Sequence, residues 1–234
     1  TKALADMDAA VAQEPKNPAH YVQRAYVYND LRKYRQAISD INKSLALEPM
    51  QASAYAARSV AFSELRDFGS ALNDANRAIE LKPDLATAYS VRGHCYTLTG
   101  DYEKAEKDLN KAIALEPGNV FFWVERGYLY EVTERWAQAR DDYSKAIGLD
   151  PSRALTYTSR GGVFLHLETW DKALGDYNRA IELTPGESRA WMGRGFAYNG
   201  LKEYDKAIAD FTQAIGLDPG LAEPYYGRGV VHHG

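Results

Sequence analysis

The sequence contains a single cysteine, Cys95, among 234 residues, so no disulfide bond can form within the chain. No apolar run approaches the roughly 18 residues that a membrane-spanning helix requires, which predicts a chain without a membrane span. The glycines stand singly, which argues against a glycine-rich phosphate loop. No targeting signal marks a compartment, and a soluble, cytoplasmic chain is the default expectation.

Positive charge is also scarce. The formal net charge is −4 and basic residues do not cluster, which argues against neutralisation of a nucleic-acid backbone. The five histidines include no pair at i, i+4 on one helix with a carboxylate, so a zinc site of that kind is not indicated. We therefore expect no cofactor, no metal, no catalytic residue and no nucleic-acid partner.

The chain is instead rich in internal repetition, which decides the fold of a protein that carries it. Seven of the nine prolines are spaced by 34 residues: Pro15, Pro49, Pro83, Pro117, Pro151, Pro185 and Pro219. An aromatic series keeps the same step: Tyr21, Tyr55, Tyr89, Trp123, Tyr157, Trp191 and Tyr225. Each 34-residue repeat reads as two helices. The first starts near the aromatic residue, and the second ends at the proline, which cannot continue a helix. We predict fourteen helices.

In residues 188–221, a set of positions matches the tetratricopeptide repeat signature: Trp191, Gly195, Tyr198, Ala207, Phe211, Ala214 and Pro219. The chain therefore resembles the tetratricopeptide repeat family over essentially its whole length. The resemblance implies an all-α solenoid of antiparallel helix pairs in a right-handed superhelix, with the first helices lining a concave groove. One hairpin cannot bury its apolar face alone, so stacking stabilises the array.

The repeat boundaries follow from the period. Residues 1–17 form the second helix of a preceding repeat and residues 222–234 the first helix of a seventh. Six full repeats of one solenoid domain lie between them: 18–51, 52–85, 86–119, 120–153, 154–187 and 188–221. Because both ends fall within a repeat, we expect a longer array or ends that pack on another surface.

Two charged series occupy places where many tetratricopeptide repeats carry apolar residues. The first helices carry Arg24, Arg58, Arg92, Arg126, Arg160, Arg194 and Arg228, and the second helices carry Asp6, Asp40, Asp74, Asp108, Asp142, Asp176 and Asp210. A buried charge is tolerable only with a well-placed partner, which predicts a ladder of structural Arg–Asp pairs. Pairing within a repeat gives six pairs and leaves Asp6 and Arg228 over. Pairing each Asp with the Arg of the next repeat gives seven, and we predict this second arrangement, for example Asp108 with Arg126.

Small residues follow each Arg: Ala25, Ser59, Gly93, Gly127, Gly161, Gly195 and Gly229. A helix-internal glycine costs about 1 kcal/mol relative to alanine, so close helix crossing must compensate.

The opposite side of each first helix, called the groove face below, varies from repeat to repeat. Its predicted ligand-binding residues are Val22, Tyr26, Asn29, Val60, Ser63, His94, Thr97, Phe121, Val124, Tyr128, Glu131, Thr158, Leu165, Met192, Phe196, Asn199 and Tyr226. Aromatic residues outside the stacking pattern suggest binding, although Tyr26 and Tyr128 have packing against adjacent first helices as an alternative role.

Family members that bind chaperone C-terminal tails hold the terminal carboxylate with a clamp that begins with Lys. That position here is Val22, Ala56, Ser90, Val124, Thr158, Met192 or Tyr226, so a chaperone tail is not expected. The sequence favours a non-enzymatic protein-interaction scaffold that binds an extended peptide or a helix with apolar side chains. The alternatives are a self-associating structural array and the regulatory arm of a larger enzyme.

Overall fold

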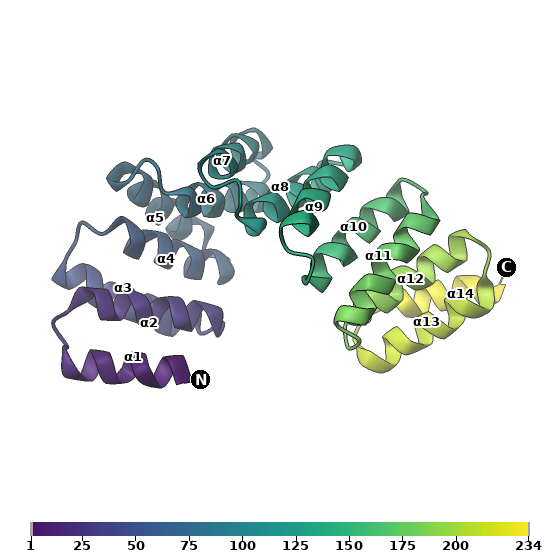
Figure 1. Cartoon of the computed structure of the whole chain (residues 1–234), viewed down its shortest axis with the longest axis horizontal. Helices are drawn as coiled ribbons and strands as arrows, with labels where there is room; N and C mark the ends of the chain where they lie inside the picture. The colour runs from purple at the N-terminus through teal and green to yellow at the C-terminus, as the bar shows by residue number, and fades with distance from the viewer. Residues whose placement is uncertain (1, 234) are drawn as a thin grey trace. The chain divides into compact units, whose positions relative to one another are not determined.

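The computed structural model describes residues 2–233, and these residues contain fourteen α-helices and no strand. Figure 1 shows them in chain order, coloured from purple to yellow. Their bounds are α1 Lys2–Gln13, α2 Pro18–Asp30, α3 Tyr34–Leu47, α4 Ala52–Glu64, α5 Phe68–Leu81, α6 Ala86–Thr99, α7 Tyr102–Leu115, α8 Val120–Val132, α9 Trp136–Leu149, α10 Ala154–His166, α11 Trp170–Leu183, α12 Ser188–Gly200, α13 Tyr204–Leu217 and α14 Glu223–His233. The predicted number of helices is confirmed.

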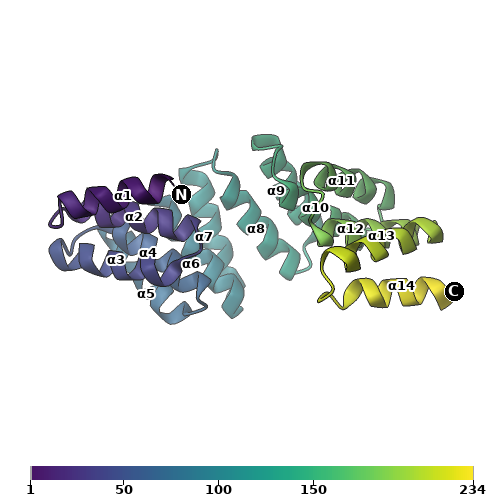
Figure 2. The ribbon, with the colours of Figure 1, turned by 90° about the horizontal axis from the view of Figure 1, so that it is seen from below.

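The chain divides into two compact halves, Thr1–Pro117 and Gly118–Gly234, each of which is described by itself. In the N-terminal half, the first helices α2, α4 and α6 contact one another in sequence, and each packs against the second helix that follows it. In the C-terminal half, α10, α12 and α14 make the corresponding contacts. Figures 1 and 2 show the antiparallel helix pairs within each half.

The first helices begin about three residues earlier than the aromatic series predicts. Helix α6 starts at Ala86 rather than Tyr89, and α8 starts at Val120 rather than Trp123. Asn119 explains the second case, because its side chain accepts a hydrogen bond from the backbone N–H of Phe121 and caps the helix. Asn17 caps α2 in the same way, with Pro18 in the first turn.

The second helices end at a leucine two residues before the repeated proline, as Leu47 and Leu115 show. The aromatic series contributes to the same corner. Tyr21 donates a hydrogen bond to the Pro15 carbonyl at 2.9 Å, and the Trp191 indole N–H donates to the Pro185 carbonyl at 2.9 Å. An aromatic ring with a polar hydrogen can therefore bury its face and satisfy a carbonyl at the turn.

The turn inside each repeat has one residue in the left-handed region. Gly100 occupies it in the third repeat with φ 86°, and Glu134 occupies it in the fourth with φ 57°. The next residue donates its N–H five positions back, as Arg135 does to the Tyr130 carbonyl at 2.7 Å. This Schellman-type closure satisfies carbonyls at the end of the first helix and turns the chain into the second.

Candidate functional site

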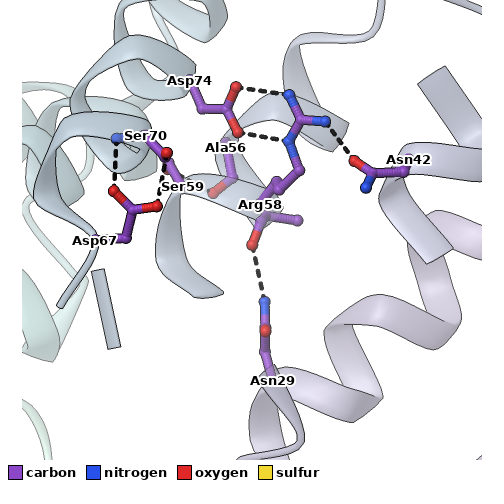
Figure 3. A network of polar contacts seen from close by, with 9 residues as sticks. Asn29, Asn42, Ala56, Arg58, Ser59, Asp67, Ser70 and Asp74 are labelled. Atoms are coloured by element: carbon purple, nitrogen blue, oxygen red, sulfur yellow. Dashed lines mark hydrogen bonds and ion pairs between the residues drawn. The ribbon is translucent and has the colours of Figure 1, made fainter. Parts of the chain in front are cut away.

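The repeated arginines form the polar framework between the first and second helices. Figure 3 shows Arg58 of α4, whose Nε and Nη2 donate to the two carboxylate oxygens of Asp74 at 2.6 and 2.8 Å. Its Nη1 donates to Asn42 of α3 in the preceding repeat at 2.6 Å. One guanidinium thus joins two consecutive second helices, and its bidentate fork fixes their orientation.

The predicted pairing between repeats is wrong. Each bidentate partner lies 16 residues after its arginine, in the same repeat: Arg24–Asp40, Arg58–Asp74, Arg92–Asp108, Arg126–Asp142, Arg160–Asp176 and Arg194–Asp210. Within the described residues, Asp6 has no ion pair and Arg228 donates to Thr212 instead. Counting pairs failed because the contact to the preceding repeat does not need an aspartate.

A second polar series supplies that contact, at the position 16 residues before the arginine. Its observed members are Asp8, Asn42, Asn76, Ser144, Asn178 and Thr212, which accept from Arg24, Arg58, Arg92, Arg160, Arg194 and Arg228. The signal was present in the sequence as a 34-residue series of small hydrogen-bond acceptors. The sequence reasoning overlooked it because the residue type varies.

The aspartates of the six pairs are buried, and the arginines lie between aromatic rings. Arg194 lies 4.6 Å above the Trp191 ring and 5.8 Å from the Tyr198 ring. Hydrogen bonding to Asp210 raises the pKa of Arg194 above its usual value, so the pair stays charged. These residues are occupied with each other and leave little capacity for a ligand.

The small residues beside the arginines make room for a side chain of the second helix. A Cβ on Gly127 would lie 2.8 Å from the Tyr143 ring, and one on Gly195 would lie 2.8 Å from the Phe211 ring. Gly229 of α14 has no such neighbour within 4 Å among the described residues. Close approach therefore explains the glycines at the first two of these positions.

The residues predicted for the groove face differ widely in exposure. Val22, Ser63 and Thr97 are buried and offer almost no side-chain surface. The half-buried members are Asn29, Val60, His94, Val124, Glu131, Thr158, Leu165, Met192, Phe196 and Asn199. The exposed members are Tyr26, Phe121, Tyr128 and Tyr226. Phe121 of α8 is 56% exposed, which is unusual for a phenylalanine.

Two groove-face residues of α2 tie adjacent first helices together. Tyr26 donates to the Ser53 carbonyl at 3.3 Å, and Asn29 donates to the Ala57 carbonyl of α4 at 3.0 Å. Figure 3 shows Asn29 directed at α4. The packing role considered for Tyr26 is thus present together with its partial exposure.

One carboxylate on the groove face has an unusual partner. Tyr143 of α9 passes beneath Gly127 and donates to Glu131 of α8 at 2.8 Å. Burial raises the pKa of Glu131 above its ordinary value, while the phenol hydrogen bond and His166 oppose the shift. A buried second-helix residue therefore reaches the groove face in the C-terminal half.

In the part of the chain that the structure describes, no three His, Cys, Asp or Glu residues are grouped as metal ligands would be. None of the described helices combines the length and the apolar character that crossing a membrane requires.

Family comparisons agree with this geometry. Models of the tetratricopeptide repeat match residues 21–49 and 52–85, residues 86–119 and 188–221, and residues 124–188. The chain belongs to the tetratricopeptide repeat family. A search of curated proteins gave no significant match.

Solved structures share the fold at low sequence identity. A chain of the APC/C hetero-tetramer Cut9–Hcn1 is 16% identical with a TM-score of 0.86; the match covers 96% of this chain and 45% of that chain. PilF of Pseudomonas aeruginosa is 19% identical with a TM-score of 0.78, over 91% of this chain and 97% of that one. YrrB, described as having an unusual peptide-binding site, is 21% identical with a TM-score of 0.65, over 81% and 97%.

Proposed function

We propose that the chain is a non-catalytic scaffold that binds a peptide or helix with apolar side chains on the groove face. The observation that carries the proposal is the split character of α8. Trp123 and Tyr130 lie against Arg126, with Cζ-to-centroid distances of 5.0 and 5.7 Å. Phe121 and Tyr128, on the opposite side of the same helix, are 56% and 37% exposed. Exposed aromatic residues are typical of protein-interaction surfaces.

The polar residues of this face favour a ligand that is not a terminal carboxylate. No lysine stands at the position where tail-binding relatives begin their clamp, and Glu131 adds negative charge in the C-terminal half. An apolar helix face, or alternate side chains of an extended peptide, would cover Phe121 and Tyr128.

The proposal is tested with binders selected from a displayed peptide library against the full chain. Their affinities are then measured by fluorescence anisotropy for the wild type and for Phe121→Ala/Tyr128→Ala. We expect the double variant to weaken binding by tenfold or more, because truncation of central aromatic anchors commonly costs about 2 kcal/mol or more. Phe196 is left intact because it packs edge-on against Phe211 at a centroid distance of 4.9 Å.

Tyr204→Ala is the matched control. Tyr204 is 44% exposed and lies at the start of the second helix α13, away from the groove face. Its loss should leave affinity unchanged. Binders that tolerate the double variant but are lost with Tyr204→Ala would place the binding surface on the second helices and overturn the proposal.

Self-association is the second candidate, and it rests on α14, where Tyr225, Tyr226 and Val230 are all exposed. Light scattering over a concentration series separates the two functions. A monomer at high concentration argues against self-association, and an oligomer that Tyr226→Ser dissociates supports it.

A further inference from the structure

The rim of the groove face in the C-terminal half contains an open pocket of about 380 Å³ between the starts of α10 and α12. Arg153, Ala154, Leu155, Thr184 and Glu187 line it. Leu155 is 64% exposed, and Phe121 lies beside the pocket under the Arg153 guanidinium, with 4.3 Å from Cζ to the ring centroid. The pocket therefore joins the exposed aromatic surface of α8.

The two polar residues of the pocket occupy N-cap positions but do not cap their helices. Neither Arg153 nor Glu187 makes a side-chain hydrogen bond to its own helix, whereas Asn119 does at the equivalent place before α8. Asn, Asp and Ser are the side chains that normally fill this role. The departures at Arg153 and Glu187 leave their polar groups for another use.

Each of these side chains has a buried atom without a hydrogen bond to any other described residue. The atoms are Arg153 Nε, which is a donor, and Glu187 Oε1, which is an acceptor. Leaving such an atom buried and unpaired costs free energy, so a ligand that satisfies it gains affinity. Burial raises the pKa of Glu187, against a hydrogen bond with Thr158 and the charge of Arg189.

We propose that this pocket recognises the primary carboxamide of a glutamine or asparagine side chain in the bound peptide, next to an apolar residue that covers Leu155. The amide oxygen would accept from Arg153 Nε–H, and the amide N–H would donate to Glu187 Oε1. A lysine would satisfy only Glu187 and face two arginines. A carboxylate would satisfy only Arg153 and face Glu187. A neutral group with one donor and one acceptor fits both.

The inference rests on the proposed function, because it names one side chain of the groove-face ligand. The probes are acetyl-Leu-Gln-N-methylamide and its Met, Glu and Lys analogues. The N-methylamide cap leaves the glutamine side chain as the one primary carboxamide in the set. Binding is followed by NMR on the full chain, through the Arg153 Nε–H and Leu155 methyl signals. We expect the Gln probe to bind about tenfold more tightly than the other three.

Two variants separate amide recognition from charge recognition. Glu187→Gln keeps an acceptor oxygen and should retain the preference for the Gln probe, whereas Glu187→Leu should abolish it. Equal binding of the Gln and Met probes, or a preference for Lys or Glu, overturns the inference. If that happens while library binders still depend on Phe121 and Tyr128, the proposed function stands. Loss of both results removes both.

Discussion

The two halves fill the same core position with different side chains. In the N-terminal half, the second-helix residue beneath the small-residue series is Ile41, Ala75 or Leu109, and in the C-terminal half it is Tyr143, Tyr177 or Phe211. The small series changes with it, from Ala25, Ser59 and Gly93 to Gly127, Gly161 and Gly195. Volume has moved from the first helix to the second while the Arg–Asp geometry is the same in both halves.

This exchange changes what the buried second helix can do. Aliphatic residues such as Ile41 end in the core, whereas Tyr143 extends far enough to hydrogen-bond Glu131 on the groove face. The C-terminal half therefore couples its second helices to the surface proposed to bind a ligand. The three predictions below test which features the halves share and which they do not.

The largest effect should come from the shared framework and be equal in both halves. Asp74→Ala and Asp176→Ala each leave a half-buried arginine without its bidentate partner, which should cost about 3–5 kcal/mol of unfolding free energy. Urea unfolding measures the loss. A clear inequality between the two variants would show that the framework does not carry the same weight in the two halves.

A double-mutant cycle tests the corrected pairing directly. Arg58→Leu and Asp74→Leu should show a coupling energy well above 0.5 kcal/mol, while Arg58→Leu and Asp40→Leu should be nearly additive. Strong coupling of Arg58 to Asp40 would restore the pairing between repeats.

An intermediate effect should separate the halves. Gly161→Ala places a Cβ 2.9 Å from the Tyr177 ring, and overpacking of this kind costs about 1–3 kcal/mol. Adding Tyr177→Leu should recover part of the loss, because the pair then resembles Ala25 and Ile41 of the N-terminal half. Gly175→Ala is the control: it lies in α11 with nothing within 4 Å of the added Cβ, and should stabilise the chain by up to about 1 kcal/mol. Equal loss in the single and double variants would show that ring clearance is not the reason for the glycine.

The smallest effect should depend on pH and be confined to the C-terminal half. Because burial raises the pKa of Glu131, its contribution to stability is present below the unfolded-state pKa and is lost as pH rises through the folded-state pKa. Glu131→Gln keeps an acceptor for Tyr143 and should therefore raise the melting temperature at pH 7. The gain should shrink as pH approaches about 4, the ordinary range of a glutamate pKa. A gain that is the same at both pH values would show that protonation is not involved.

The sequence predicted the fold well because the 34-residue period repeats every stacking contact. Pro117, Trp123 and Ala105 each report a position that six other repeats confirm. The start of a first helix was less predictable, since Asn119 caps α8 through a local hydrogen bond that the aromatic series does not reveal.

The contacts of the candidate site were harder to predict than its helices. Arg126 was expected to pair with Asp108 because that scheme left no charge over, but side-chain reach places Asp142 against it. Exposure on the groove face also varied where the helical projection predicted uniformity: Val22 is buried and Phe121 is exposed. Neighbouring helices decide these two, and a single helix projection does not contain them. Arg153 and Glu187 carried no periodic signal at all.

The paired contacts of the repeated arginine have a consequence for how such a chain can change length. Arg58 finds its aspartate 16 residues ahead and its amide acceptor 16 residues behind, so every bond it makes falls within one repeat of itself. Deleting or duplicating any 34-residue block inside a half brings an equivalent aspartate and acceptor to the same offsets. The arginine framework thus makes whole-repeat gene duplication structurally neutral, whereas an insertion of any other length would leave a guanidinium facing the wrong side chain.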